Sequence, residues 1–103
     1  MLKIQRLANG KVVYTLSGRM NAEQAAELDK LIGGESEGIR IVVDLKDLTL
    51  VDRDAVRFLE RCEAGGISLR NSPMYIRMWI DRERSYARLR GEHRNLSDAT
   101  REN

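Results

Sequence analysis

Cysteine and histidine are almost absent from this sequence. Cys62 is the only cysteine, so the chain cannot form an internal disulfide. The only histidine, His93, lies far from Cys62 in the sequence. Zinc sites of the common kinds need several such ligands, and we therefore expect no metal ion and no cofactor.

Long hydrophobic runs are missing as well. No apolar stretch approaches the roughly 20 residues that cross a bilayer, and the opening MLKIQRLANG lacks the apolar centre of a signal peptide. Hydrophobic residues make up 42% of the 103 positions and charged residues 33%, a composition typical of a globular chain. We expect one cytoplasmic domain over residues 1–90, with no membrane partner, and a polar, flexible tail over residues 91–103.

Neither sign of charge is in large excess. There are 18 basic and 16 acidic residues, which gives a net charge of +2. A nucleic-acid-binding domain is usually much more basic, so the composition predicts no nucleic-acid partner.

The N-terminal residues carry a hairpin signal. Two alternating runs, Leu2–Leu7 and Lys11–Leu16, flank the pair Asn9 and Gly10. Because these two residues tolerate positive φ angles, the pattern predicts two antiparallel strands joined by a tight turn.

A helix signal follows in NAEQAAELDKLIGG. Asn21 and Gln24 have the spacing of a capping box, apolar residues recur at helical intervals, and Gly33 and Gly34 close the segment. The pattern predicts a helix from about residue 22 to 32.

The middle of the chain alternates again between strand and helix. GIRIVVDL, residues 38–45, predicts a short strand buried on both faces at the middle of a sheet. From Arg53 onward, apolar residues at intervals of three and four predict a helix that ends before Gly65 and turns Cys62 toward the core.

The last two elements complete an α/β pattern. ISLRN, residues 67–71, predicts a strand, and Ser72 with Pro73 predicts the start of a helix. The order is ββαβαβα. It predicts an N-terminal β-hairpin joined to a mixed, partly parallel four-stranded sheet with about three packed helices.

Over residues 12–80 the chain resembles the STAS domain family, which includes bacterial anti-sigma factor antagonists and the cytoplasmic tails of sulphate transporters. The segments that carry the resemblance are LSGRMNAEQAAEL, IVVDLKDLTLVDRDAV, CEAGGISLRN and SPMYIRMWI. Asp44, Leu48, Val51 and Asp52 fit the family pattern of a buried strand that leads into a helix. The resemblance implies a non-enzymatic module of bacterial transcription regulation that binds a protein partner, such as an anti-sigma factor kinase or a signalling scaffold.

The chain departs from the family where the antagonists are phosphorylated. Their phosphoacceptor serine follows the aspartate matched by Asp52, and this chain has Arg53 there, followed by Asp54 and Ala55. Arginine has no hydroxyl group, so phosphorylation at position 53 is excluded. Thr49 and Ser36, in predicted loops, are the candidate phosphoacceptors that remain.

Four carboxylates lie near the predicted end of the central strand: Asp44, Asp47, Asp52 and Asp54. Open α/β sheets often place ligands there. Catalysis also needs a second kind of group, and only Lys46 and Thr49 are close in sequence, so we expect no enzyme. Asp52 instead fits a helix cap that accepts from the amide of Asp54 or Ala55.

We expect the partner-binding residues in the loop and helix over residues 48–61: Asp52, Arg53, Asp54, Arg57 and Arg61. The three arginines recur every fourth residue, opposite the apolar face, and could steer an acidic partner. They could equally form a solvated face that Asp54 and Glu60 partly neutralise.

Two further hypotheses remain open. The chain could be a small-molecule or nucleotide sensor that uses a crevice near Asp44 and Asp52. Tyr75 and Trp79, four residues apart on the last helix, could form a homodimer or partner patch, or could cover the edge of the core.

Overall fold

A computed structural model describes residues 1–90 of the chain. Strands β1 (Leu2–Ala8) and β2 (Val12–Met20) form the predicted antiparallel hairpin. Gly10 in the turn has a φ angle of 77°, a conformation that glycine adopts without strain. The predicted tail, residues 91–103, lies outside the described residues.

Helix α1 (Ala22–Gly33) begins with the predicted capping box. The Asn21 side chain accepts hydrogen bonds from the amides of Glu23 and Gln24, and the Gln24 side chain accepts from the Asn21 amide at 2.9 Å. These bonds satisfy amides that have no partner inside the helix.

Strand β3 (Ile41–Val51) is longer than the sequence predicted. The prediction ended this strand at Leu45, but β2 runs parallel to it as far as the pair Met20 and Val51. Two irregularities in the β2–β3 pairing shift the register and interrupt the alternation of buried and exposed residues. Leu48 and Val51 remain buried, so the segment predicted as a connection belongs to the sheet.

The remaining elements are helix α2 (Arg53–Ala64), strand β4 (Ser68–Arg70) and helix α3 (Met74–Arg90). The strand order is β1-β2-β3-β4, and β3 lies between two parallel neighbours as predicted. Pro73 precedes α3 by one residue, and its carbonyl accepts from the Arg77 amide at 2.9 Å. The element order ββαβαβα and the mixed four-stranded sheet are confirmed.

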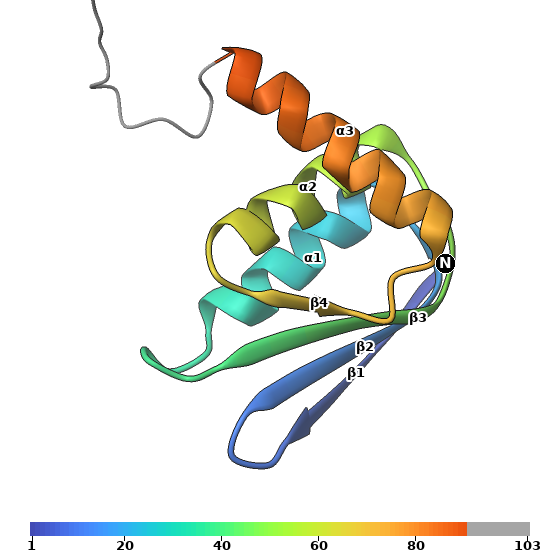
Figure 1. Ribbon diagram of the computed structural model, residues 1–103. Helices are drawn as coiled ribbons and strands as arrows, with labels where there is room; N and C mark the ends of the chain where they lie inside the picture. Colours follow the sequence, from blue (N-terminus) through green and yellow to red (C-terminus); the bar gives the residue numbers. More distant parts are fainter. Residues whose placement is uncertain (91–103) are drawn as a thin grey trace, which may run out of the picture.

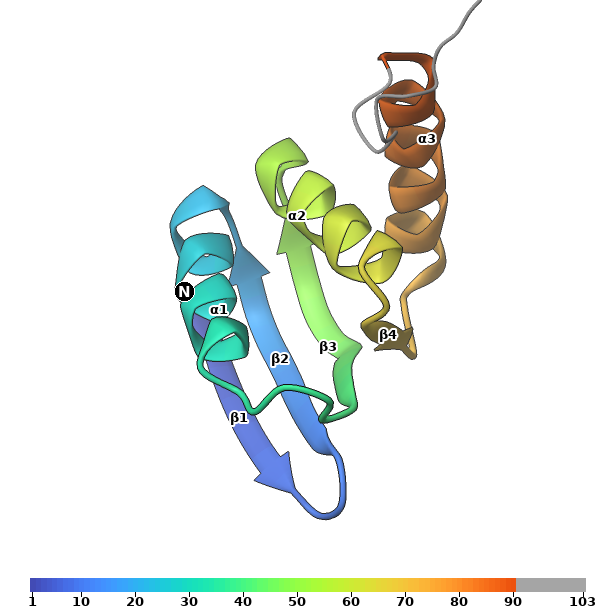
Figure 2. The same ribbon diagram turned by 90° about the vertical axis from the view of Figure 1, so that its left-hand side faces the viewer.

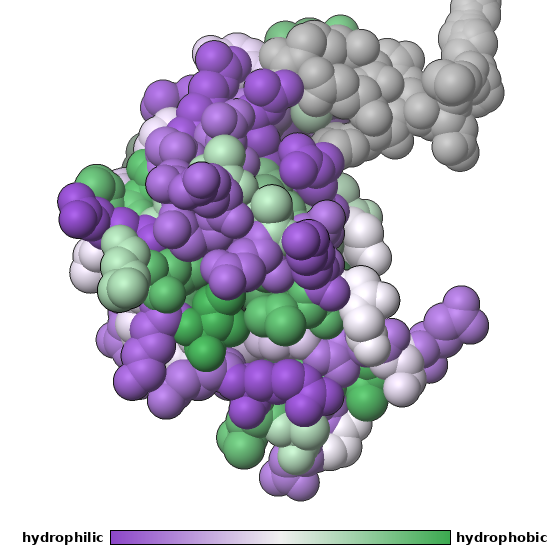
Figure 3. Space-filling model, turned by 180° about the vertical axis from the view of Figure 1, so that it is seen from behind, coloured by the Kyte–Doolittle hydropathy of each residue, from purple (hydrophilic) through white to green (hydrophobic). Residues whose placement is uncertain are grey.

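The three helices lie beside one another along the sheet, with α2 in the middle (Figures 1 and 2). At the margin of the core, side chains such as Leu2, Ile4 and Ile32 are only partly buried. In the view from behind, hydrophobic side chains reach the surface in a band between two hydrophilic zones (Figure 3).

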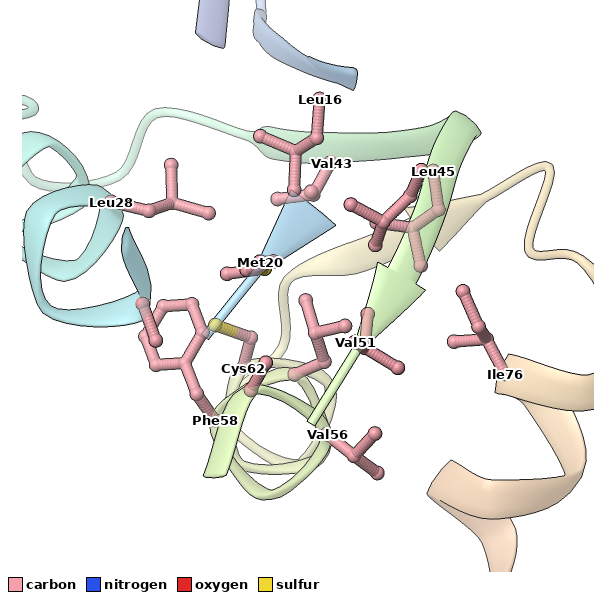
Figure 4. Close-up of a cluster of buried hydrophobic side chains, with 14 of the residues drawn as sticks. Leu16, Met20, Leu28, Val43, Leu45, Val51, Val56, Phe58, Cys62 and Ile76 are labelled. Atoms are coloured by element: carbon pink, nitrogen blue, oxygen red, sulfur yellow. The ribbon is translucent and has the colours of Figure 1, made fainter. Parts of the chain in front are cut away.

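The core fills the space between the sheet and the helices (Figure 4). Leu16 and Val43 point into it from the sheet, Leu59 from α2 and Ile76 from α3, and all four are fully buried. Cys62 lies among them as predicted, and its burial raises the pKa of its thiol to about 12. The thiol is therefore neutral at physiological pH and acts as a small apolar group.

A polar cluster of Arg6, Tyr14 and Glu35 connects the loop after α1 to the hairpin. The buried Tyr14 hydroxyl donates to a carboxylate oxygen of Glu35, and Arg6 donates to both oxygens of that carboxylate at 2.8 and 2.9 Å. The bonds from Arg6, followed by the bond from Tyr14, lower the pKa of the Glu35 carboxyl to about 2. The loop thus has one fixed anchor beside the start of β3.

Candidate partner-binding surface

The predicted binding residues lie on the side of α2 that faces away from the sheet. Val51 ends β3, and the Asp52 carboxylate accepts from the Ala55 amide at 2.9 Å, which starts α2 as predicted. Because Ala55, Leu59 and Cys62 face the core, the side chains of Arg57 and Arg61 between them are directed outward, whereas Glu60 is buried.

Three of the predicted residues share one groove. A hollow of about 480 Å³ separates α1 from α2, and Asp54, Arg57 and Arg61 line its α2 side together with Phe58. The α1 side consists of Ala22, Ala25, Ala26 and Asp29. The alanines recur at intervals of three and four, a spacing visible in the sequence, and their small side chains leave the groove open.

Asp52 lies on a different hollow. This second hollow, of about 300 Å³, is found at the carboxyl ends of β2 and β3, beside the start of α1. Its lining is Met1, Arg19, Met20, Asn21, Gln24, Leu50, Val51 and Asp52. The lining does not include Asp44.

Arg53 turns toward α3. Its Nε lies 3.3 Å from Oε2 of Glu83, and Nε of Arg57 lies 3.9 Å from Oε1 of the same carboxylate. Glu83 is only 4% exposed. The three arginines therefore do not form one continuous solvated stripe, because α3 packs along α2 and supplies a counter-ion that the sequence had not indicated.

Further charge pairs hold α3 against α2. Glu63 accepts from Arg77 at 2.7 and 2.9 Å and also from Arg84. These bonds, that from Arg77 above all, lower the pKa of the Glu63 carboxyl to about 2. The buried Glu60 carboxylate lies 3.6 Å from Nε of Arg84. These charge pairs, together with the apolar residues of α3, therefore hold this helix in its place beside α2.

Asp44 ties two strands together instead of lining a crevice. Its buried carboxylate accepts from the Lys46 amide at 2.9 Å and from the Asn71 side chain at 3.2 Å, and Nε of Arg70 lies 3.6 Å away. Asp44 lies within β3, whereas Asp52 follows the end of that strand. The four aspartates do not converge, and residues 1–90 contain no group of three or more side chains arranged to hold a metal ion.

The two candidate phosphoacceptors lie apart. Thr49 is exposed on β3, not in a loop as predicted, and its hydroxyl donates to the carbonyl of Gly18 at 2.9 Å. Ser36 is exposed in the segment between α1 and β3. Neither side chain lines the groove between α1 and α2.

Tyr75 and Trp79 differ in burial. The Tyr75 hydroxyl donates to the Thr49 carbonyl at 2.7 Å, and the residue is 47% exposed. Trp79 is partly buried against the core. Trp79 therefore covers the edge of the core, whereas Tyr75 contributes to the outer surface of α3.

No protein-family model and no curated protein matches this chain. Within the part of the chain that the structure describes, no helix combines the length and the apolar character needed to span a bilayer. The fold is a mixed α/β sheet with its helices in one row (Figure 2). Hollows lined in part by charged residues of α2 lie on either side of this helix.

Proposed function

We propose that this chain is a non-enzymatic, STAS-like interaction module that binds a regulatory protein through α2 and the groove between α1 and α2. The observation that carries the proposal is that Asp54, Arg57 and Arg61, which follow the cap residue Asp52, line that one groove. By resemblance, the partner is an anti-sigma factor kinase or a signalling scaffold in the bacterial cytoplasm.

The groove suits a protein partner because it combines small apolar residues with charges of both signs. The alanines of α1 and Phe58 offer apolar surface, and Arg61 and Asp29 lie at its sides. Interfaces commonly join an apolar centre to a charged rim that steers the partner and sets its orientation.

Arg53 leaves this surface without a phosphorylation switch at position 53. A phosphorylated serine would add a charge of about −1.5 to −2 that a phosphatase could remove, whereas Arg53 carries a permanent positive charge that is paired with Glu83. Partner binding is therefore independent of phosphorylation at position 53.

Affinity capture with the full chain tests the proposal. Arg61→Glu reverses an exposed charge of the groove, and Ala26→Phe fills the groove without changing its charge. Each variant should reduce the quantity of the captured partner by about tenfold or more, a loss of about 1.4 kcal/mol in binding free energy.

The matched control is Arg40→Glu, the same charge change at an exposed position just before β3. It should leave the captured quantity unchanged. A partner that both groove variants retain would contradict the proposal, provided that their thermal unfolding matches that of the parent. Phosphosite mapping of the captured chain would show whether Ser36 or Thr49 acts as an alternative phosphoacceptor.

The alternative is a small-molecule or nucleotide sensor that uses the hollow beside Asp52. Its volume of about 300 Å³ is at the lower end of the range for ligand pockets, and it lies where parallel strands end. A thermal-shift screen with nucleotides and small anions would reveal such a ligand, since a concentration of 100 times the dissociation constant stabilises by roughly 2.7 kcal/mol. The interaction-module proposal predicts no shift.

A further inference from the structure

Helix α3 lies at the end of the helix row and contacts α2 on one side only (Figure 2). Ile76, Ile80 and Glu83 face inward and are buried. At about 100° per residue, six other positions fall within an arc of about 100° on the outer side. We call these residues the outer stripe: Tyr75, Met78, Trp79, Arg82, Tyr86 and Leu89.

The outer stripe is mainly apolar and is open to solvent. Met78 is 57% exposed, Tyr86 43% and Leu89 81%. From Tyr75 to Leu89 the stripe extends about 21 Å along the helix. Apolar residues that line up on an exposed helix face are typical of surfaces that bind another protein segment.

A hollow lies at the centre of the outer stripe. It has a volume of about 450 Å³ and is lined by Arg53, Trp79, Arg82, Glu83 and Tyr86. Two aromatic rings and two guanidinium groups therefore surround one buried carboxylate, which leaves the hollow with an excess of positive charge.

Arg82 provides most of that excess. Among the residues that the structure describes, no carboxylate forms an ion pair with Arg82, whereas Arg53 already contacts Glu83. An incoming carboxylate would thus meet an available guanidinium group beside apolar surface, an arrangement that favours an acidic ligand.

We propose that the outer stripe binds an acidic amphipathic helix of a partner protein. Aliphatic residues of such a helix would cover Met78, Tyr86 and Leu89, and its glutamate or aspartate residues would pair with Arg82 and Arg53. The stripe is separate from the groove between α1 and α2, and the proposal does not rest on the function proposed for that groove.

Charge argues against a second copy of this chain as the occupant. A two-fold axis through the centre of the outer stripe would pass beside Arg82 and bring the two copies of this arginine together, where their charges repel. The predicted homodimer through Tyr75 and Trp79 is therefore a less favourable use of this surface.

The apolar ends of the stripe argue against nucleic acid. Single-stranded nucleic acids bind to aromatic rings on which successive bases stack, together with basic groups along the backbone. Met78 and Leu89 offer neither, but they match aliphatic side chains of a helix.

Trp79 allows a direct test because it is the only tryptophan and lines the hollow. The full chain is titrated with a synthetic helical peptide of about three heptads that has leucine at the inner positions and glutamate at most others. A matched peptide carries lysine in place of glutamate. We expect a saturable change of tryptophan fluorescence with the glutamate peptide and none with the lysine peptide.

Variants of the chain complete the test. Arg82→Glu should weaken binding of the glutamate peptide at least tenfold, Arg82→Lys should retain most of it, and Arg61→Glu in the separate groove should leave it unchanged. No fluorescence change, or an equal response to both peptides, would overturn the proposal. A fluorescence change produced by raising the protein concentration alone would indicate self-association and would also overturn the proposal. The same holds for a change produced by a single-stranded oligonucleotide but not by the glutamate peptide.

Discussion

Arg53 of α2 contacts Glu83 of α3, with Nε 3.3 Å from Oε2, although the arginine side chain is 59% exposed and the carboxylate only 4%. Arg57 lies 3.9 Å from the other oxygen of the same carboxylate. A buried carboxylate is costly unless cations or hydrogen bonds compensate its charge. Arg53 therefore helps to hold α3 against α2.

We predict that Arg53→Glu destabilises the fold, because it places a second negative charge beside Glu83. Arg57 remains beside the carboxylate, so the expected cost is about 1–3 kcal/mol in the free energy of unfolding. Urea unfolding of the parent and the variant measures the loss. In the background of Glu83→Gln, which removes the buried charge, the same substitution should cost clearly less. Equal losses in both backgrounds would show that the two residues do not interact.

Stability should also fall in acid because of Glu35 and Glu63. Folding lowers the pKa of each carboxyl from 4.5 to about 2, so the unfolded chain binds more protons between these pH values. The contribution of both groups is complete above about pH 4.5 and is lost as the pH falls toward 2.

Urea unfolding at a series of pH values tests this dependence. Glu35→Gln should flatten the decline between pH 4.5 and 2, because that carboxyl no longer takes up a proton on unfolding. Glu27→Gln, at an exposed position of α1, provides the matched control and should leave the decline nearly as steep as in the parent. A parent stability that does not change across this range would refute the prediction.

The sequence predicted those parts of the fold that local chemistry determines. The turn at Gly10, the capping box of Asn21 and the cap at Asp52 each depend on residues a few positions apart, and all three are present in the structure. The far half of β3 was missed because its backbone is paired with β2, far away in sequence, while its register irregularities hide the alternating pattern.

The positions of the surface residues could likewise be predicted only where local sequence spacing determines them. The four-residue spacing placed Arg57 and Arg61 correctly on the outward side of α2. Neither the counter-ion Glu83 nor the alanines of α1 could be assigned to that surface, because the sequence alone does not determine how α1 and α3 pack beside α2. Only the tertiary structure shows where the predicted partner-binding residues lie. Asp52 lines the hollow at the ends of β2 and β3, and Arg53 pairs with Glu83. Asp54, Arg57 and Arg61 line the groove between α1 and α2.

Cys62 should be unreactive in the folded protein. It is 8% exposed, and burial raises the pKa of its thiol to about 12, so the reactive thiolate is scarce at pH 8. A thiol reagent such as a disulfide-exchange dye should modify Cys62 only after the chain opens, at a rate that rises with urea. Rapid labelling without denaturant would show that the α2 side of the core is not closed as described.

Among the glycines of residues 1–90, Gly18 is the one that leaves the least room for a side chain. Its φ angle is +103°, and a Cβ atom added there would lie 2.4 Å from the carbonyl oxygen of Met1, which accepts from the Arg19 amide at 3.1 Å. Gly18→Ala should therefore destabilise the chain by about 1–3 kcal/mol, since both the backbone strain and the displaced N-terminal residue oppose it.

Gly33→Ala is the matched control for this substitution. Gly33 is the last residue of α1, and a Cβ atom added there would meet no atom within 4 Å. Because alanine loses less backbone entropy in a helix than glycine, this variant should be neutral or more stable by up to about 1 kcal/mol. The midpoint temperature of thermal unfolding should thus fall for Gly18→Ala and stay unchanged or rise for Gly33→Ala. Equal shifts would mean that the close approach of Met1 to Gly18 does not constrain the hairpin.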